Sequence, residues 1–228
     1  TRLKKNISSL KYSLSDQFNL EEIILEVISR NKFINQVIYV QISRGTDIVR
    51  DHVPSNDLIP TIFVSSHELK TEFSPSSGEK AILLEDFRWR KSQIKATSLL
   101  ANVIYRSEAK HQEVFETILF ENGFITEGAV SNIFCCIDNK IITPPLTQNI
   151  LPGVTRKVIL ELIQNTSLEY EETKIPVDSF LLAEEIWVTN STKGIIPIIE
   201  VDGKQIGSGI PGEKYLQISK AFINKLSG

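Results

Sequence analysis

The stretch RWRKSQIKAT, residues 88–97, places Lys95 just before a segment with the apolar spacing of a helix. Thirty-two positions after Lys95, Glu127 stands in a second informative stretch, TEGAVSN, residues 126–132. A lysine amine attacks carbonyl carbons, and a carboxylate favours the protonated form of a nearby nitrogen base. Together the two stretches predict a site that combines an amine nucleophile with an acid.

The bulk composition restricts the class of protein. The 228 residues, 41% of them hydrophobic, suffice for a sizeable core in one large domain or two smaller ones. A formal charge of -3 without a Lys/Arg block argues against nucleic-acid binding. No apolar run approaches the roughly 18 residues of a membrane span, and the N-terminus lacks a signal-peptide core. We expect a cytoplasmic protein that acts on small molecules, without nucleic-acid or membrane partners.

The chain contains two cysteines, Cys135 and Cys136, which are adjacent in an apolar stretch. Neighbouring side chains on a strand point to opposite faces, so this spacing does not favour a shared disulfide or metal. We expect two reduced packing cysteines and no metal site.

The first part of the chain predicts a small α/β domain. Leu20, Ile23, Ile24, Val27 and Ile28 fall on one helical face, and the spacing of Asn19 and Glu22 is typical of a capping box. A strand is expected at 36–43, where Arg44-Gly45 ends it. The polar stretch 71–79 contains Pro and Gly and is the best candidate linker. We therefore place domain boundaries at 1–73 and 74–228.

The second part predicts a larger, mostly antiparallel β domain with helices. A helix is expected at 99–110, with Leu99, Leu100, Val103 and Ile104 as its buried face. A second helix is expected at 154–164, and a third follows residue 212. The expected strands are 81–84, the hairpins 114–120 with 124–126 and 133–137 with 140–143, and 185–189 with 195–201.

The order of several motifs closely resembles the fold-type IV pyridoxal-phosphate enzymes, the class IV aminotransferases. The motifs are Arg88-Trp89, Ile94-Lys95, Glu116, 126–128, Ser131-Asn132 and 150–156. The likeness is closest to D-amino acid aminotransferases. It implies an α+β fold in which a small N-terminal α/β domain precedes a larger domain with a mostly antiparallel pseudo-barrel sheet and flanking helices. It also implies a homodimer with shared active sites.

The resemblance assigns roles residue by residue. Lys95 matches the lysine that forms a Schiff base with pyridoxal 5′-phosphate and then moves the substrate proton, and Glu127 matches the acid on the pyridine nitrogen. Arg88 is expected to lie near Glu127 and keep it ionised. A helix that begins at Val154 offers backbone N–H groups to the phosphate. The cofactor-binding set is Arg2, Lys95, Glu127, Leu151, Val154, Thr155, Ser191 and Thr192.

Substrate recognition is expected from Arg50 and His52, which resemble the element that holds the substrate α-carboxylate in D-amino acid aminotransferases. A guanidinium grips a carboxylate bidentately, and in the family the element comes from the neighbouring subunit. The expected reaction is transamination of D-amino acids to 2-oxo acids, with 2-oxoglutarate or pyruvate as acceptor. The alternatives are an aminodeoxychorismate lyase, a branched-chain L-amino acid aminotransferase and a non-catalytic homologue.

The chain also departs from the family pattern. Gln93 stands where an acid commonly precedes the Ile-Lys pair, and Ala129-Val130 replace a more hydroxyl-rich run. The first residue corresponds to a position roughly fifty residues into the family's usual length, judged against ordinary domain sizes. We therefore expect the N-terminal domain to be truncated at its start.

Overall fold

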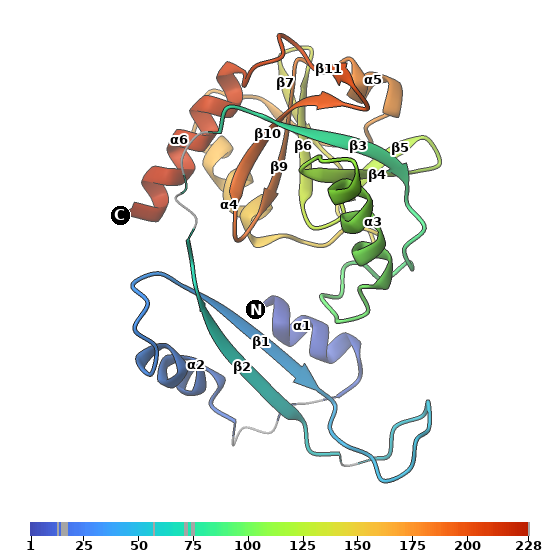
Figure 1. The fold of residues 1–228 in the computed structure, drawn as a ribbon, viewed down its shortest axis with the longest axis vertical. Helices are drawn as coiled ribbons and strands as arrows, with labels where there is room; N and C mark the ends of the chain where they lie inside the picture. Colours follow the sequence, from blue (N-terminus) through green and yellow to red (C-terminus); the bar gives the residue numbers. More distant parts are fainter. Residues whose placement is uncertain (13, 15–17, 57, 71–72, 74–75, 228) are drawn as a thin grey trace. The chain divides into compact units, whose positions relative to one another are not determined.

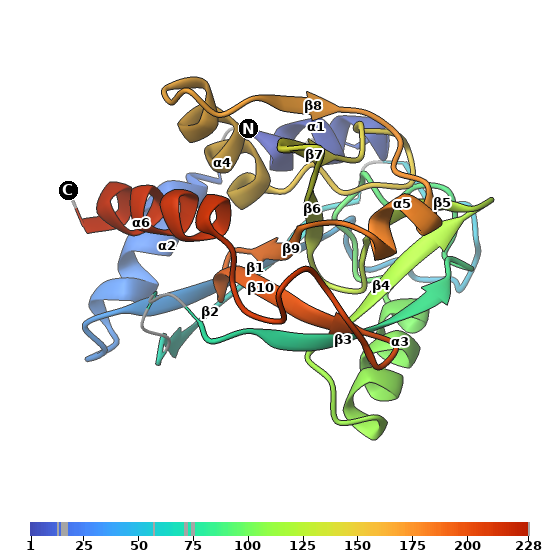
Figure 2. The same ribbon diagram turned by 90° about the horizontal axis from the view of Figure 1, so that it is seen from above.

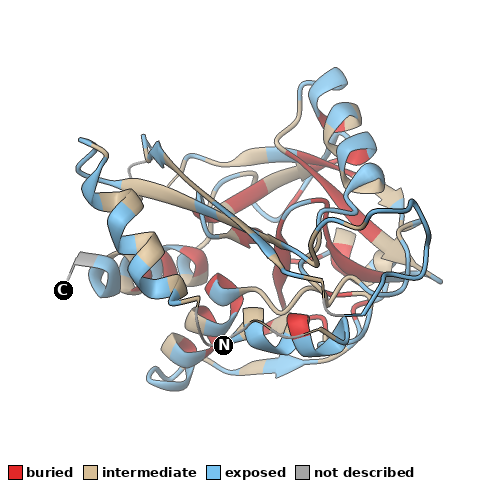
Figure 3. Cartoon of the chain, turned by 90° about the horizontal axis from the view of Figure 1, so that it is seen from below, coloured by how far each residue is buried: buried red, intermediate tan, exposed pale blue. Residues whose placement is uncertain are grey.

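The computed structural model describes residues 1–12, 14, 18–56, 58–70, 73 and 76–227. The chain divides into two compact units, Thr1–Thr71 and Glu72–Gly228, and each is described by itself. Figure 1 labels the elements, and Figure 3 shows that buried residues concentrate in the strands of the second unit. Among the described helices, none is both long and apolar enough to cross a bilayer.

The first unit is a β-hairpin with two helices. Strand β1 (Gln36–Ser43) pairs antiparallel with β2 (Thr61–Glu68), and α2 (Leu20–Ser29) packs on this pair. The Asn19 side chain caps α2 by accepting from the Glu22 amide at 3.3 Å, as the sequence predicts. Helix α1 (Arg2–Ser9) and strand β2 were not predicted, because neither segment carries a sustained apolar period.

The second unit is built on a nine-stranded mixed sheet in the order β5-β4-β3-β10-β9-β6-β7-β8, with β11 paired to β10. Figures 1 and 2 show this sheet curling around its core. Five of the eight strand pairs are antiparallel, and the parallel ones are β3/β4, β3/β10 and β7/β8. The strands are β3 (Glu79–Glu85), β4 (Glu116–Glu121), β5 (Phe124–Gly128), β6 (Asn132–Ile137), β7 (Lys140–Thr143), β8 (Tyr170–Glu172), β9 (Glu185–Asn190), β10 (Gly194–Val201) and β11 (Lys204–Gln205).

The two larger hydrophobic cores among the described residues cover the two faces of this sheet. One joins Trp187 and Phe134 to helices α4 (Val154–Gln164) and α6 (Glu213–Ser227), which lie on the same side of the sheet in Figures 1 and 2. The other contains Phe180 of α5 (Val177–Leu181) and inward residues of six strands. Both predicted hairpins and the helix at 154–164 are confirmed.

Helix α3 (Leu100–His111) lies between the parallel strands β3 and β4 in sequence, and its predicted buried face is wrong. The apolar side chains expected to be inside are 47–77% exposed: Leu99, Leu100, Val103 and Ile104. Tyr105 packs instead against Leu119, and Ala109, one turn further along, is also buried. The Tyr105 hydroxyl donates to the Glu85 carbonyl oxygen at 2.7 Å, which holds this side of α3 against the sheet. The apolar stripe of α3 therefore faces outward.

Candidate active site

Glu127 lies near the end of β5 and is 4% exposed. Arg88, from the segment after β3, donates to Glu127 Oε1 at 2.6 Å. The same guanidinium donates twice to Asp86, at 2.9 and 2.6 Å, and Thr126 donates to Asp86 at 2.9 Å. The predicted contact between Arg88 and Glu127 is therefore present, and Asp86 holds the guanidinium in place.

The second oxygen of Glu127 accepts from two further donors. The Asn132 Nδ2 donates to Oε2 at 3.1 Å, and the Leu151 amide donates to it at 2.9 Å. An ionised carboxylate offers about four acceptor positions, and these contacts with Arg88, Asn132 and Leu151 fill three of them. A further donor, such as a protonated ring nitrogen, has one position left.

Burial raises the pKa of Glu127 to about 7, although the charge and hydrogen bond of Arg88 pull it down. Asp86 also raises this pKa, because its negative charge disfavours a second ionised carboxylate nearby. The predicted effect of Arg88, which is to favour the ionised form of Glu127, is therefore present but is opposed by burial. A cationic group at the open acceptor position would favour the carboxylate form.

The start of α4 carries the predicted anion site. Helix α4 begins at Val154, Gly153 is its N-cap, and no described side chain caps its first amides. Such amides, at the positive end of the helix dipole, bind phosphate well. Thr155 is 6% exposed and Val154 is 52% exposed, so the first turn is open on one side.

The turn between β9 and β10 carries Ser191 and Thr192, both exposed. The Asn190 side chain orders this turn by accepting from the Thr192 amide and hydroxyl at 3.1 and 3.2 Å. Thr189, which precedes Asn190 on β9, is the cross-strand partner of Asn132. Helix α4 packs on β9. A Cβ on Gly153 would lie 2.0 Å from Asn132 Oδ1, so the start of α4 also adjoins Asn132.

Lys95 follows a turn at 92–94 and is exposed. The chain just before it is bound to the segment that leads to α4: the Gln93 amide donates to the Gln148 carbonyl at 3.3 Å. Arg88 donates to the Asn149 carbonyl at 3.2 Å. The chain two residues before Lys95 is thus bound to the segment that ends at Leu151, whose amide donates to Glu127.

The other predicted residues lie in the first unit. Arg2 is in the first turn of α1, and Arg50 and His52 are exposed in the loop between β1 and β2. At the base of this loop Gly45 has φ +126°, and a Cβ there would lie 2.3 Å from the Ile59 carbonyl oxygen. The contribution of these three side chains to the site stays a prediction.

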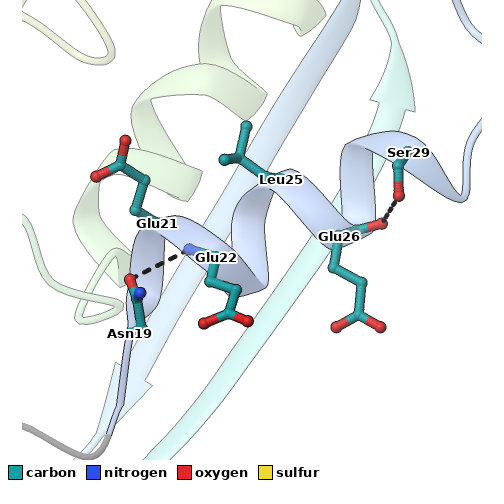
Figure 4. A pocket seen from close by; sticks show the side chains of 6 residues that line it. All are labelled: Asn19, Glu21, Glu22, Leu25, Glu26 and Ser29. Atoms are coloured by element: carbon teal, nitrogen blue, oxygen red, sulfur yellow. Dashed lines mark hydrogen bonds between the residues drawn. The ribbon is translucent and has the colours of Figure 1, made fainter.

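A surface pocket on α2 lacks the features of a phosphate site. Its lining consists of Asn19, Glu21, Glu22, Leu25, Glu26 and Ser29. Figure 4 shows the three glutamates standing off the helix, and their charges would repel an anionic ligand. The residues with features of a cofactor site lie in the second unit.

Sequence reasoning missed three contributors: Asp86, Asn132 and Thr189. The motif 126–132 contains Asn132 but assigns it no role, and Asp86, two positions before Arg88, lies outside the motifs. Thr189 has a buried hydroxyl without a partner among the described residues, on the strand beside Asn132. Alternation along β6 and β9 is the signal that would have placed Thr189 and Asn132 on one face.

Residues 1–201 match the family described as amino-transferase class IV, so the chain belongs to this family. The protein is therefore a pyridoxal-phosphate-dependent aminotransferase with the fold-type IV architecture, which confirms the resemblance and the fold class predicted from the sequence.

Its relatives include the D-alanine aminotransferase of Bacillus licheniformis, 33% identical over 227 residues, which are 99% of this chain and 80% of that protein. A solved branched-chain amino acid aminotransferase from Escherichia coli is 27% identical, with a TM-score of 0.86 over 98% of this chain and 75% of that one. The branched-chain enzyme from Thermobaculum terrenum, solved in its PLP-bound holo form, has a TM-score of 0.85 over 99% of this chain and 76% of that one. At 20% sequence identity, this structural likeness shows only that the two chains share a fold.

The residues present fit pyridoxal phosphate. Glu127 has an acceptor position for the ring nitrogen, and the start of α4 offers uncapped amides to a phosphate. The Thr189 hydroxyl, buried and without a described partner, provides an additional polar group on the same face as Asn132. A buried orphan hydroxyl is costly unless a ligand or water satisfies it, so its presence here is consistent with a bound polar ligand.

Proposed function

We propose that this aminotransferase converts D-amino acids to 2-oxo acids, with 2-oxoglutarate or pyruvate as the acceptor. The observation that carries the proposal is the exposed Arg50-Asp51-His52 sequence in the loop that connects β1 to β2 (Figure 1). An Arg and a His two positions apart provide a bidentate donor and a second donor for one carboxylate. The D-alanine aminotransferase relatives support the same substrate class.

Each predicted cofactor-binding or catalytic side chain has a defined part in this reaction. Bound pyridoxal phosphate supplies an aldehyde that takes up the substrate amine and a ring that withdraws electrons from the α-carbon. Lys95 holds the cofactor until substrate arrives, and its freed amine then removes the α-proton. Glu127 keeps the ring nitrogen protonated. Val154, Thr155, Ser191 and Thr192 hold the phosphate, and Arg2 adds a cation to it.

Arg50 and His52 act on the substrate of a neighbouring subunit. They fix the α-carboxylate and thereby determine which face of the α-carbon meets the Lys95 amine. Asp47 keeps their loop in shape, since it accepts from the Ser55 amide at 2.8 Å and from the Ser55 hydroxyl at 2.9 Å.

Turnover of D-alanine with 2-oxoglutarate, compared with L-leucine and aminodeoxychorismate, tests this function. We expect turnover of D-alanine only. Arg50→Ala should raise KM for D-alanine roughly 10- to 100-fold, because a charged hydrogen bond contributes about 1.5–3 kcal/mol. Arg30→Ala, which removes an exposed arginine paired with Glu26 on α2, is the control and should leave KM unchanged.

The branched-chain L-amino acid aminotransferase is the second candidate, favoured by the Escherichia coli structure at 27% identity. Exclusive turnover of L-leucine would establish this alternative, and release of pyruvate from aminodeoxychorismate would establish a lyase. A purified protein that binds no pyridoxal phosphate would instead be the non-catalytic homologue.

The outward apolar stripe of α3 supports a homodimer. Leu100 is 77% exposed and Val103 57%, and contiguous apolar patches of this kind mark protein interfaces. In this arrangement a partner subunit covers α3 and delivers its own Arg50 loop to the site. We also propose that the units correspond to a smaller domain, 1–73, and a cofactor-binding domain, 74–228, supported by the division at Thr71 and Glu72.

Leu100→Glu is expected to weaken the dimer, because it buries a charge in the interface at a cost of several kcal/mol. Sedimentation equilibrium should show a dissociation constant at least roughly 100-fold higher than that of the wild type. Leu182→Glu changes an equally exposed leucine, 84% exposed, next to α5 and serves as the control. A dimer of unchanged affinity in Leu100→Glu would show that α3 lies outside the interface.

A further inference from the structure

Asn132 is the first residue of β6 and is 5% exposed. Its Nδ2 donates to Glu127 Oε2 at 3.1 Å and to the Leu151 carbonyl at 2.9 Å. A primary amide has two N–H bonds, and these contacts use both. The Leu151 amide completes the arrangement by donating to the same Glu127 oxygen at 2.9 Å.

The other end of the amide faces the start of α4. A Cβ built on Gly153 would lie 2.0 Å from Asn132 Oδ1, whereas its distance to the Arg156 Cβ would be 3.6 Å. Only a glycine fits this approach without displacement, since real Cβ atoms do not come closer than about 3.0 Å. The Asn132 side chain therefore lies between the carboxylate of Glu127 and the backbone that leads into Val154.

We propose that Asn132 is a positioning residue that holds Glu127 and the start of α4 in one fixed arrangement, so that both ends of the cofactor meet pre-set partners. The inference rests on the proposed roles of Glu127 and α4. A rigid separation matters because misplacement by about 1 Å of a group that orients the reacting atoms costs a large factor in rate. Asn132 reaches the reaction only through Glu127 and Leu151.

The charges around Glu127 define the expected pH behaviour. Arg88 and Asp86 face it from the segment after β3, and Asn132 and Leu151 provide neutral donors. Donors to an ionised carboxylate lower its pKa, so losing the Asn132 amide should raise the pKa of Glu127 further. A carboxyl group with a higher pKa would hold more tightly a proton that it shares with the ring nitrogen of a bound cofactor.

Asn132→Ala tests this with two measurements. Fluorescence titration of the apoprotein with pyridoxal phosphate should show binding weakened roughly 10- to 100-fold, because hydrogen bonds that involve a charged group are the strong ones. The ¹⁵N chemical shift of labelled bound cofactor should move toward that of a neutral pyridine. A residue with a purely structural role would leave this shift unchanged.

Gly153→Ala provides a second, independent variant. When Asn132 is present, the Cβ that Gly153→Ala adds pushes the Asn132 amide away from Glu127, so cofactor binding should weaken about tenfold. In the Asn132→Ala background the clashing oxygen is gone, so the same change should have little further effect. Gly212→Ala is the matched control, because its Cβ would meet a side chain equally closely, 2.1 Å from Glu185. Glu185 accepts from the Lys214 amide at the start of α6.

The outcomes separate the two proposals. Wild-type cofactor affinity and an unchanged ¹⁵N shift in Asn132→Ala would overturn the role of Asn132 alone. Additive effects of Gly153→Ala and Asn132→Ala would also overturn it, because the two changes would then act independently. A wild-type protein that binds no pyridoxal phosphate would overturn the proposed function, and this inference with it.

Discussion

Lys95→Ala is expected to abolish transamination, with kcat reduced by at least ~10⁴-fold, because one side chain is both the covalent anchor of the cofactor and the base for the α-proton. The fold should be retained. Lys95 is exposed, and truncation of an exposed side chain usually changes the free energy of unfolding by no more than about 0.5 kcal/mol. Loss of activity with an unchanged melting temperature would therefore report on chemistry and not on folding.

The measurement is a coupled assay of D-alanine turnover, together with borohydride reduction and peptide mapping of the wild type. Reduction should fix the cofactor on Lys95 and on no other lysine. Lys91→Ala is the matched control, since it removes another exposed lysine from the same segment and should retain full activity. Label on Lys91, or undiminished turnover by Lys95→Ala, would contradict the assigned role.

The sequence predicted those elements whose local pattern and tertiary environment agree. The helix at 154–164 has an apolar stripe that packs on β9, and the hairpin turns contain residues that accept positive φ, such as Asn122 and Gly123 at 52° and 79°. Helix α3 was placed correctly, but its apolar stripe faces outward. Periodicity locates an apolar face, whereas the partner that covers this face is a property of the assembly.

The candidate site shows the same division. Lys95, Glu127 and the start of α4 are recognisable because their motifs are contiguous in the sequence. The polar network is not, because it joins Arg88, Glu127 and Leu151, which come from three separate segments 39 and 24 positions apart. A bond between residues so far apart has no local sequence signal.

Glu127→Gln is expected to lower kcat roughly 10²- to 10³-fold, the usual effect of removing one electrostatic partner from a buried site. The amide retains the size of the side chain but carries no negative charge to hold the ring nitrogen protonated. It also brings two N–H donors to a position where Arg88 donates on one side and Asn132 and Leu151 on the other. One of these contacts must therefore be lost, at a cost of about 1–3 kcal/mol.

The same variant has a defined effect on stability. The pKa of Glu127 in the folded protein is about 7, above its ordinary value of 4.5, so the folded state binds the proton more tightly than the unfolded state. The resulting stabilisation is complete below pH 4.5 and is lost as the pH rises through 7. Without cofactor, the wild type should therefore lose about 3 kcal/mol across this range relative to Glu127→Gln.

Urea unfolding of the apoproteins at about pH 5 and about pH 8 captures most of this difference. Glu121→Gln is the control, because Glu121 is likewise bound by an arginine and an asparagine, Arg90 at 3.0 Å and Asn149 at 2.7 Å, but lies at the end of β4. It should keep the wild-type pH dependence and turnover. If Glu127→Gln followed the wild-type curve, Glu127 would already be ionised at pH 5, and Arg88 would outweigh burial even without a cofactor.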